Sequence, residues 1–320
     1  MAITKFNLSD HYRGNLTWLP ERTIFLTRHG SQAYGTSTPT SDLDVKGICV
    51  PPKEYILGFT KTFEQTEIKG DPDVVVYDIR KFFKLASDCN PNIIEVLFTS
   101  PEDWFLTTPV FEKLYAYRHL FLSKKARHTF SGYAMSQLKR IHTHKRWLLN
   151  PPTHKPGREE YGLSDQHKVV TRDEMGALDK LVEEGYTVDE HAMRVLQKEK
   201  LYQNALLEWT QYETWKKTRN EKRSATEAKF GYDTKHAMHL VRLLRMCREI
   251  LAEGVVHVRR SDAEELIAIR NGAWSYENLM AWAEEQDSKL EELYITSKLP
   301  HASDRDRLDV LCMEIIESML

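Results

Sequence analysis

The chain has 320 residues, of which 41% are hydrophobic and 29% are charged, and its formal net charge is −2 at pH 7. This length predicts two domains, or one domain with a large elaboration, and the hydrophobic fraction is sufficient for packed cores. The near-neutral charge excludes a uniformly basic nucleic-acid coat but allows a local basic groove. The 14 glycines and 12 prolines are too few for a fibrous or linker-dominated protein.

No segment of the sequence has the pattern of a membrane span or a secretory leader. The N-terminal stretch has no hydrophobic region behind its single Lys5, and no run of about 18 apolar residues occurs. The cysteines are too far apart to suggest a zinc cage or a disulfide framework; they are Cys49, Cys89, Cys247 and Cys312. We therefore expect a soluble, reduced, cytoplasmic protein without a membrane partner.

Before about residue 100 the sequence predicts α+β structure. Short runs of β-branched and aromatic residues predict strands at 23–27, 43–50 and 74–77. Asp78 is a predicted N-cap, because its carboxylate can accept the free backbone N–H groups at the start of a helix. Asn90-Pro91 ends that helix, and another is expected from Ile93.

From about residue 120 onward the pattern is helical. A basic helix is predicted at 121–150, and the prolines of 150–157 interrupt it. Further helices are expected at 173–230, 234–252, 261–270, 275–293 and 305–319. These patterns predict an α+β fold in two parts, residues 1–120 and 121–320, with an internal break near 150–157.

The most informative stretch combines a Gly-Ser pair with two nearby aspartates. Gly30 and Ser31 follow a predicted strand, where a turn can hold phosphate oxygens with its free N–H groups and its hydroxyl. On a strand, Asp42 and Asp44 point to the same face. Two adjacent carboxylates repel one another unless a cation lies between them, so they predict a Mg²⁺ site. Either motif alone is common, but together they are the parts that two-metal phosphoryl transfer requires.

The segment GSQAYGTSTPTSDLDVKGI closely resembles the signature of the DNA polymerase β-like nucleotidyltransferase superfamily. The segments VVVYDIRKFFKLASDCNPNIIEVLF (74–98) and GYDTKHAMHLVRLLRMCREILAEG (231–254) resemble its RlaP subgroup, predicted nucleotidyltransferases associated with RNA repair. The resemblance covers most of the chain and is weaker in 150–230. It implies a polymerase-β-like catalytic domain with a small mixed sheet at 1–120 and a larger all-helical domain at 121–320.

The resemblance also implies roles for individual residues. The Gly-Ser pair matches the phosphate-holding pair, and Asp42 and Asp44 match the metal-binding pair. The superfamily usually adds a third carboxylate on a neighbouring strand, which binds one metal and helps to deprotonate the attacking hydroxyl. Asp73 and Asp78 compete for that role. We favour Asp73, which opens its strand where the family pattern places the acid, because Asp78 is better explained as a helix cap.

A second cluster lies on the helix predicted after residue 233. Lys235, His239 and Arg242 are spaced so that they share one face of that helix. Such groups suit the phosphates of an NTP or an RNA backbone. The alternative is a solvated helix face; we expect a nucleotide-binding role.

The stretch 124–147 is rich in Lys, Arg and His and has no acidic residue. Cations interleaved with aromatic rings are typical of platforms that bind single-stranded nucleic acid. The cations expected to contact nucleic acid are Lys139, Arg140, Lys145 and Arg146. Alternatively, the aromatic residues are core residues and the charges face water. We expect the histidines to be hydrogen-bonded or exposed rather than metal ligands, because no Cys or carboxylate lies nearby at ligand spacing.

These features predict a metal-dependent nucleotidyltransferase of the EC 2.7.7 type. It would transfer NMP from an NTP, with ATP favoured, to a hydroxyl acceptor and release pyrophosphate. Two Mg²⁺ or Mn²⁺ ions would be held by Asp42, Asp44 and Asp73. The acceptor that we favour is an RNA end, in tRNA or a broken RNA, and the long helices leave room for a homodimer.

Two other functions are compatible with the sequence. Some superfamily members transfer AMP to a Ser, Thr or Tyr hydroxyl of a protein, in toxin–antitoxin or phage-defence settings, but these are typically short single domains. The other is a catalytically inactive nucleotide- or RNA-binding protein. The intact Gly-Ser and Asp-x-Asp motifs count against an inactive site, because decay usually removes a metal carboxylate first.

Overall fold

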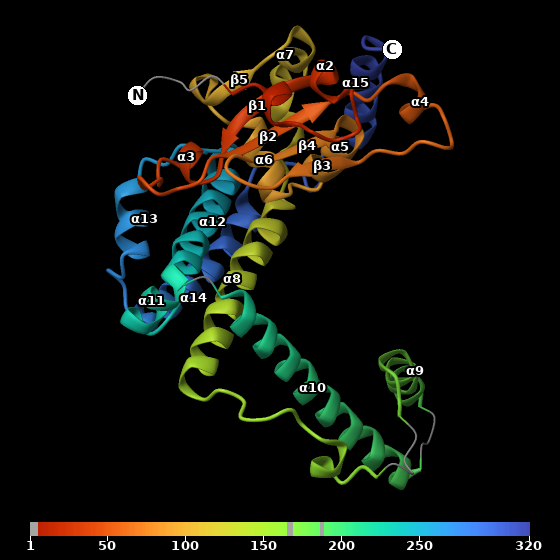
Figure 1. The fold of residues 1–320 in the computed structure, drawn as a ribbon, viewed down its shortest axis with the longest axis vertical. Helices are drawn as coiled ribbons and strands as arrows, with labels where there is room; N and C mark the ends of the chain where they lie inside the picture. The colour runs from red at the N-terminus through yellow and green to blue at the C-terminus, as the bar shows by residue number, and fades with distance from the viewer. Residues whose placement is uncertain (1–5, 165–168, 186–188, 220) are drawn as a thin grey trace. The chain divides into compact units, whose positions relative to one another are not determined.

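The computed structural model describes residues 6–164, 169–185, 189–219 and 221–320 (Figure 1). The chain forms two compact units, one from Met1–Ile141 with Thr234–Leu320 and the other from His142–Asp233. The fold class is α+β, as predicted. The first unit combines the sheet part with the helices after residue 234, so the division expected at residue 120 falls inside it. The domain boundary at residue 120 stays a prediction.

The first unit contains a five-stranded sheet in the order β3-β4-β2-β1-β5. Its strands are β1 (Thr23–His29), β2 (Asp44–Cys49), β3 (Gln65–Ile68), β4 (Asp73–Asp78) and β5 (Trp104–Leu106). The β2–β4 pair is parallel and the other neighbouring pairs are antiparallel, so the sheet is mixed. The three predicted strands correspond to β1, β2 and β4. The sequence missed β3 and β5, which are short edge strands without a fully buried residue.

One face of the sheet is covered by the N-terminal segment, which includes α1 (Leu8–His11) and α2 (Leu19–Arg22). The apolar side chains that the strands contribute to this core include Leu26, Val45, Val74 and Val76. Successive side chains of a strand point to opposite faces. The residues that alternate with these, Asp44 and Lys46 on β2 and Asp73 on β4, therefore lie on the other face.

Helices pack on that other face of the sheet. They are α5 (Ile79–Ser87), α6 (Pro91–Leu97) and α7 (Pro109–Ala116), with α3 (Gly30–Tyr34) at the end of β1 and α15 (Arg305–Glu317) against α5 and α7. Short connecting helices are α4 (Lys53–Ile56), η1 (Pro101–Asp103) and η2 (Arg118–Phe121). The predicted start of α5 is confirmed, since the Asp78 side chain accepts from the Arg80 backbone N–H. Asn90 caps α6 in the same way, and α5 ends at Ser87, just before the predicted break at Asn90-Pro91.

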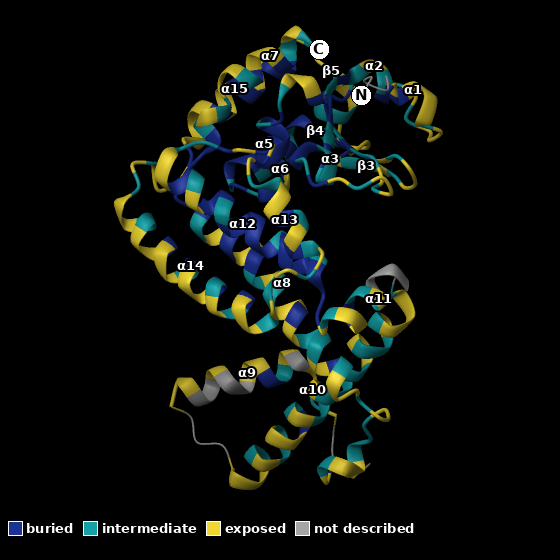
Figure 2. Cartoon of the chain, turned by 90° about the vertical axis from the view of Figure 1, so that its left-hand side faces the viewer, coloured by how far each residue is buried: buried dark blue, intermediate teal, exposed yellow. Residues whose placement is uncertain are grey.

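Helix α12 (Thr234–Glu253) is the central helix of the remaining part of the first unit. It packs against α13 (Ala263–Arg270) and α14 (Tyr276–Thr296). The predicted apolar stripe is buried; it consists of Leu240, Leu244, Cys247 and Leu251. Burial extends to most of its other faces as well, whereas α14 exposes one side to solvent (Figure 2). Lys235, His239 and Arg242 of α12 are therefore buried or half-buried rather than on a fully solvated face.

The second unit is helical. Its helices are α9 (Arg172–Glu183), α10 (Glu190–Thr218) and α11 (Glu221–Phe230), with the short η3 (Arg158–Tyr161). The basic helix predicted at 121–150 is α8 (Ala126–Leu149), and residues 150–157 have no regular structure, as predicted. The helical stretch predicted at 173–230 includes residues 186–188 and 220, which lie outside the described residues. Trp147, Tyr212 and Trp215 pack together in this unit.

The cysteines, Cys49, Cys89, Cys247 and Cys312, are all free and buried. Burial raises the pKa of the Cys247 and Cys312 thiols to about 12, so both are neutral at pH 7. None of the helices in the described part of the chain combines the length and the apolar character needed to cross a membrane.

Candidate active site

A cavity of about 420 Å³ lies in the first unit. Its walls come from the end of β1 and the starts of α3, β2 and β4 on one side, and from α6, α12 and the end of α13 on the other. The structure brings together in it every residue that the sequence predicted to bind nucleotide or metal: Gly30, Ser31, Asp42, Asp44, Asp73, Lys235, His239 and Arg242. These residues are up to 212 positions apart, and no single segment could form the cavity alone.

Three carboxylates share one wall of the cavity. Asp44 and Asp73 are direct partners in the parallel pairing of β2 and β4, and Asp42 lies in the loop just before β2. Burial and the neighbouring charges of Asp73 and Asp42 raise the pKa of the Asp44 carboxyl, although Lys46 and Lys235 partly offset this rise. Negative charge is therefore concentrated here, which is the condition that favours a bound cation.

Asp78, the competing candidate for the third carboxylate, lies at the opposite end of β4. It pairs with Cys49 in the sheet, is buried, and caps α5. Its Oδ2 also accepts a hydrogen bond from Arg80 Nη2 at 2.6 Å. This geometry favours Asp73, which lies beside Asp44, and the assignment of Asp73 as a metal ligand stays a proposal.

Gly30 occupies a backbone conformation and a space that suit glycine. Its φ is +63°, in the left-handed region, and a Cβ at this position would lie 2.0 Å from Asp44 Oδ2. The closeness follows from the sheet, because His29 and Asp44 are paired across β1 and β2. The glycine therefore allows the turn that carries Ser31 to approach the carboxylate wall.

Helix α12 supplies the wall that faces the carboxylates. Burial and the nearby cations of Arg242 and Lys235 lower the pKa of His239 to about 3, so its imidazole is neutral at neutral pH. Arg242 lines the cavity, but its Nη1 donates to Glu95, and its guanidinium carbon lies 3.8 Å from the centre of the Tyr34 ring. Lys235 and His239 are half-buried on the same wall.

The polar residues of the cavity that sequence reasoning missed include Lys46, Asn92 and Arg270. Lys46 follows Asp44 on β2 at the same spacing of two that separates Asp42 from Asp44, so this period could have identified it. Its Nζ donates to the Asn92 carbonyl oxygen at 3.4 Å, and burial lowers its pKa to about 8. Asn92 and Arg270 carry no comparable signal, because only the tertiary fold brings α6 and α13 to the cavity.

The aromatic residues of the basic stretch 124–147 are mostly core residues. Phe130 is fully buried and Trp147 is 5% exposed, whereas Tyr133 is 40% exposed. Two of the three rings are therefore unable to stack on nucleic-acid bases, and the alternative interpretation is correct for them. Trp147 packs against the rings of Tyr212 and Trp215 on α10.

Several cations of the same stretch already have partners. Lys125 pairs with Asp88 at 2.7 Å and Arg127 pairs with Asp287 at 3.0 Å. Among the four residues expected to contact nucleic acid, Lys139, Arg140 and Arg146 are exposed, Lys145 is half-buried, and Arg146 pairs with Glu208 at 2.6 Å. Their contact with nucleic acid stays a prediction.

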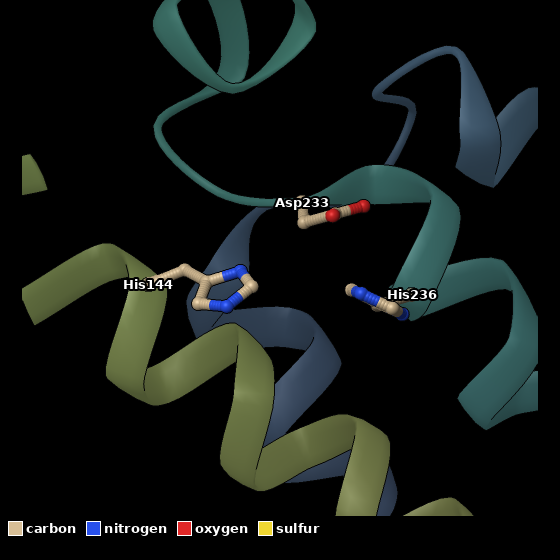
Figure 3. A group of neighbouring side chains, drawn as sticks. All are labelled: His144, Asp233 and His236. Atoms are coloured by element: carbon tan, nitrogen blue, oxygen red, sulfur yellow. The ribbon is translucent and has the colours of Figure 1, made fainter. Parts of the chain in front are cut away.

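Figure 3 shows polar side chains that do not line the cavity. They include His144 on α8 and His236 in the first turn of α12, and the His236 side chain is buried. Within the second unit, the ring of His144 stacks on Trp147 with a centroid separation of 5.7 Å, and its Nδ1 lies 3.8 Å from Glu227 Oε1. His144 is thus packed among aromatic rings and next to a buried carboxylate.

The mixed sheet, the Gly-Ser turn and the paired aspartates are features of the polymerase-β-like class. Residues 7–154 match the RlaP family, described as the RNA repair pathway DNA polymerase beta family. The resemblance to the RlaP subgroup is thereby confirmed over residues 7–154, and the family points to a nucleotidyltransferase in RNA repair.

A relative in Enterobacteria phage T4 is also similar to this chain. It is named as an uncharacterized 38.9 kDa protein in the nrdC-mobD intergenic region, and it is 38% identical over 90 residues. The aligned part covers 25% of this chain and 27% of the phage protein. No solved structure matches the chain.

Proposed function

We propose that this protein transfers a nucleoside monophosphate from an NTP to the terminal hydroxyl of an RNA. The observation that carries the proposal is the cavity in which a Gly-Ser turn, three carboxylates and several cations meet. Phosphate oxygens would bind to the turn at Gly30 and Ser31 and to the cations of Lys46, Lys235 and Arg270. Carboxylates and cations that line the same cavity suit a substrate that is itself a metal–phosphate complex.

The reaction follows from these roles. The acceptor oxygen attacks the α-phosphorus, the bond from that phosphorus to the bridging oxygen breaks, and pyrophosphate leaves. Asp73 would take the proton of the acceptor hydroxyl. Lys235 and Arg270 would hold the negative charge that grows on the pyrophosphate as it leaves.

The residues of the carboxylate wall fit divalent cations. Mg²⁺ and Mn²⁺ prefer oxygen ligands. Burial and the neighbouring Asp73 carboxylate raise the pKa of Asp44, and a bound cation would compensate this negative charge. Asp42, Asp44 and Asp73 would hold two such ions. When bound, the ions would act as Lewis acids on the phosphates, which typically contributes several kcal/mol of transition-state stabilisation.

An RNA acceptor is supported by the RNA-repair description of the matching family and by the exposed cations of α8. ATP is the NTP that we favour. Exposed cations on a helix can neutralise backbone phosphates without reading sequence.

The test is label transfer. Each of the four α-³²P-labelled NTPs is incubated with the protein, Mg²⁺ or Mn²⁺, and either total RNA or a cell protein extract. Label is expected on RNA, and Asp44→Asn should reduce the rate about a thousandfold, as the loss of several kcal/mol implies. Asp71→Asn is the matched control, because Asp71 Oδ1 only accepts from the Leu43 backbone N–H at 3.1 Å, and an asparagine oxygen can do the same.

The three outcomes separate the alternatives. Label on RNA that depends on Asp44 supports the proposal and identifies the nucleotide. Label on a protein band would show protein nucleotidylylation instead. Label on neither substrate, together with NTP binding, would indicate a binding protein without transferase activity.

A further inference from the structure

A buried ionic cluster lies in the first unit next to the cavity. At its centre is Glu95 of α6, which is fully buried. The Tyr34 hydroxyl donates to Glu95 Oε2, Arg242 Nη1 donates to Glu95 Oε1, and His29 Nε2 lies 3.4 Å from Oε2. The guanidinium of Arg242 also lies over the Tyr34 ring, with its central carbon 3.8 Å from the ring centre.

The charges within this cluster are balanced. Burial lowers the pKa of His29 to about 4, so the imidazole is neutral at pH 7. Burial alone would raise the pKa of the Glu95 carboxyl, but the charge of Arg242, the nearby His29 ring and the hydrogen bond from Tyr34 hold it below its usual range. The cluster therefore contains one anion and one cation, and the Arg242 guanidinium forms an ion pair with the Glu95 carboxylate.

The four residues come from four elements that form the cavity (Figure 1). His29 ends β1 and directly precedes Gly30, and Tyr34 is the last residue of α3, so the Gly-Ser turn lies between two partners of Glu95. Arg242 lies on the same face of α12 as Lys235 and His239. Glu95 thus contacts residues at both ends of the Gly-Ser turn and also Arg242 of α12, so it links the turn to that helix.

We propose that Glu95 is a positioning residue that holds the Gly-Ser turn and the cavity face of α12 in register for catalysis. Arg242 acts through Glu95 rather than by contacting the nucleotide. The inference rests on the proposed function, because it concerns the alignment of the same substrate. A purely structural role is the alternative, yet buried ion pairs can often be replaced by apolar residues without loss of stability.

This last property provides the test. The triple variant Tyr34→Phe/Glu95→Met/Arg242→Met replaces the acid, the cation and the hydroxyl by apolar groups of similar size. We expect its thermal midpoint to stay within a few degrees of wild type, while kcat falls about 100-fold. The KM for the NTP should change less than kcat, because the turn and Lys235 remain present but are misaligned.

The matched control removes the same three kinds of group elsewhere in the first unit. Asp287 accepts from Ser131 Oγ at 3.0 Å and pairs with Arg127 at 3.0 Å. The triple variant Ser131→Ala/Asp287→Leu/Arg127→Met should leave both kcat and KM unchanged. An equal loss of kcat in both triple variants would mean that the Glu95 effect is general destabilisation, and this result would overturn the inference.

A second variant covers the case in which the first triple variant does not fold. Arg242→Lys keeps a cation opposite Glu95 but loses the planar group that lies over Tyr34. We expect a fall in kcat of about tenfold with little change in the thermal midpoint. An unchanged kcat in this variant, or in a folded triple variant, overturns the inference but not the proposed function. A wild-type protein that neither transfers nor binds an NTP overturns both.

Discussion

At the scale of single residues, the closest constraint in the site is between Gly30 and Asp44. The pairing of β1 with β2 brings the turn so near to the carboxylate that a methyl group at Gly30 would overlap with it. A second glycine, Gly35, has a similar backbone conformation with φ of +78°, but a Cβ there would lie 3.6 Å from Ala263 Cβ, an ordinary contact. Substituting both glycines therefore distinguishes the effect of backbone strain, which both positions share, from displacement of Asp44, which only Gly30 would cause.

Gly30→Ala and Gly35→Ala should each lower the free energy of unfolding by about 1–2 kcal/mol, the cost of a left-handed alanine. The Asp44 carboxylate can rotate away from a new methyl group, so the extra cost in stability at Gly30 is small. Its displacement should nevertheless reduce nucleotidyl transfer at least tenfold in Gly30→Ala only. Urea denaturation and the label-transfer rate are the measurements. Similar transfer by both variants would contradict the assignment of Asp44 to the site.

At the scale of elements, the connection between α12 and α13 is an ion-pair network. Asp262 accepts from Arg260 Nε at 2.8 Å and from Arg245 Nη1 at 2.6 Å. Burial alone would raise the pKa of Asp262, but these hydrogen bonds and charges lower it to about 2. Because α13 carries Arg270 to the cavity, this network contributes indirectly to the shape of the site.

The lowered pKa of Asp262 predicts the pH dependence of stability. A carboxyl whose pKa is lower in the folded state stabilises the protein above its unfolded pKa of about 4, and this contribution is lost as the pH falls to about 2. Asp262→Asn should lower the free energy of unfolding at pH 7 by at most about 2 kcal/mol, since solvent screens part of the effect. Urea denaturation at several pH values should show a shallower decline below pH 4 in the variant. Parallel curves for the two proteins would contradict this role.

The exposed face of α8 gives a second prediction for an element. Lys139 and Arg140 are exposed in the first unit, and we expect their cations to neutralise RNA phosphates. Lys139→Glu/Arg140→Glu should weaken RNA binding and make its dependence on salt concentration less steep. Lys53→Glu/Lys84→Glu, on the exposed faces of α4 and α5, is the control with the same change of charge. Equal salt slopes for the two variants would indicate that α8 is a solvated face.

At the scale of the whole molecule, the cavity belongs to one compact unit. All of its lining residues fall within Met1–Ile141 and Thr234–Leu320. The unit His142–Asp233 has its own internal contacts, including the pair of Arg158 with the buried Glu199 at 2.8 Å. Nucleotide binding should therefore be a property of the first unit.

Replacing residues 142–233 by a flexible Gly/Ser linker tests this expectation. The shortened protein should keep its affinity for Mg²⁺-NTP within about threefold, because the lining residues are retained and a longer or shorter loop changes closure entropy only slowly. Calorimetric titration is the measurement, and the shortened protein carrying Asp44→Asn is the control. A loss of NTP binding in a shortened protein that still unfolds cooperatively would show that the second unit supplies part of the site.

The sequence by itself determined the local elements and the chemically active motifs. The α+β class, the cap at Asp78, the break at Asn90-Pro91 and the apolar stripe of α12 all follow from short-range patterns, and the Gly-Ser and Asp-x-Asp motifs belong to one contiguous stretch. Such patterns are readable because capping, turn formation and side-chain alternation depend on neighbours a few residues away.

Only the tertiary structure decided which distant groups meet. The parallel pairing of β2 and β4 places Asp73 beside Asp44, and the packing of α6, α12 and α13 brings Asn92, Lys235 and Arg270 to one cavity. It also decided that Arg242 is paired with Glu95, although its helical spacing had suggested a free phosphate-binding cation. The physical reason is that long-range packing and burial fix the partner of a charged group, and spacing along one helix carries no information about the residues packed against it.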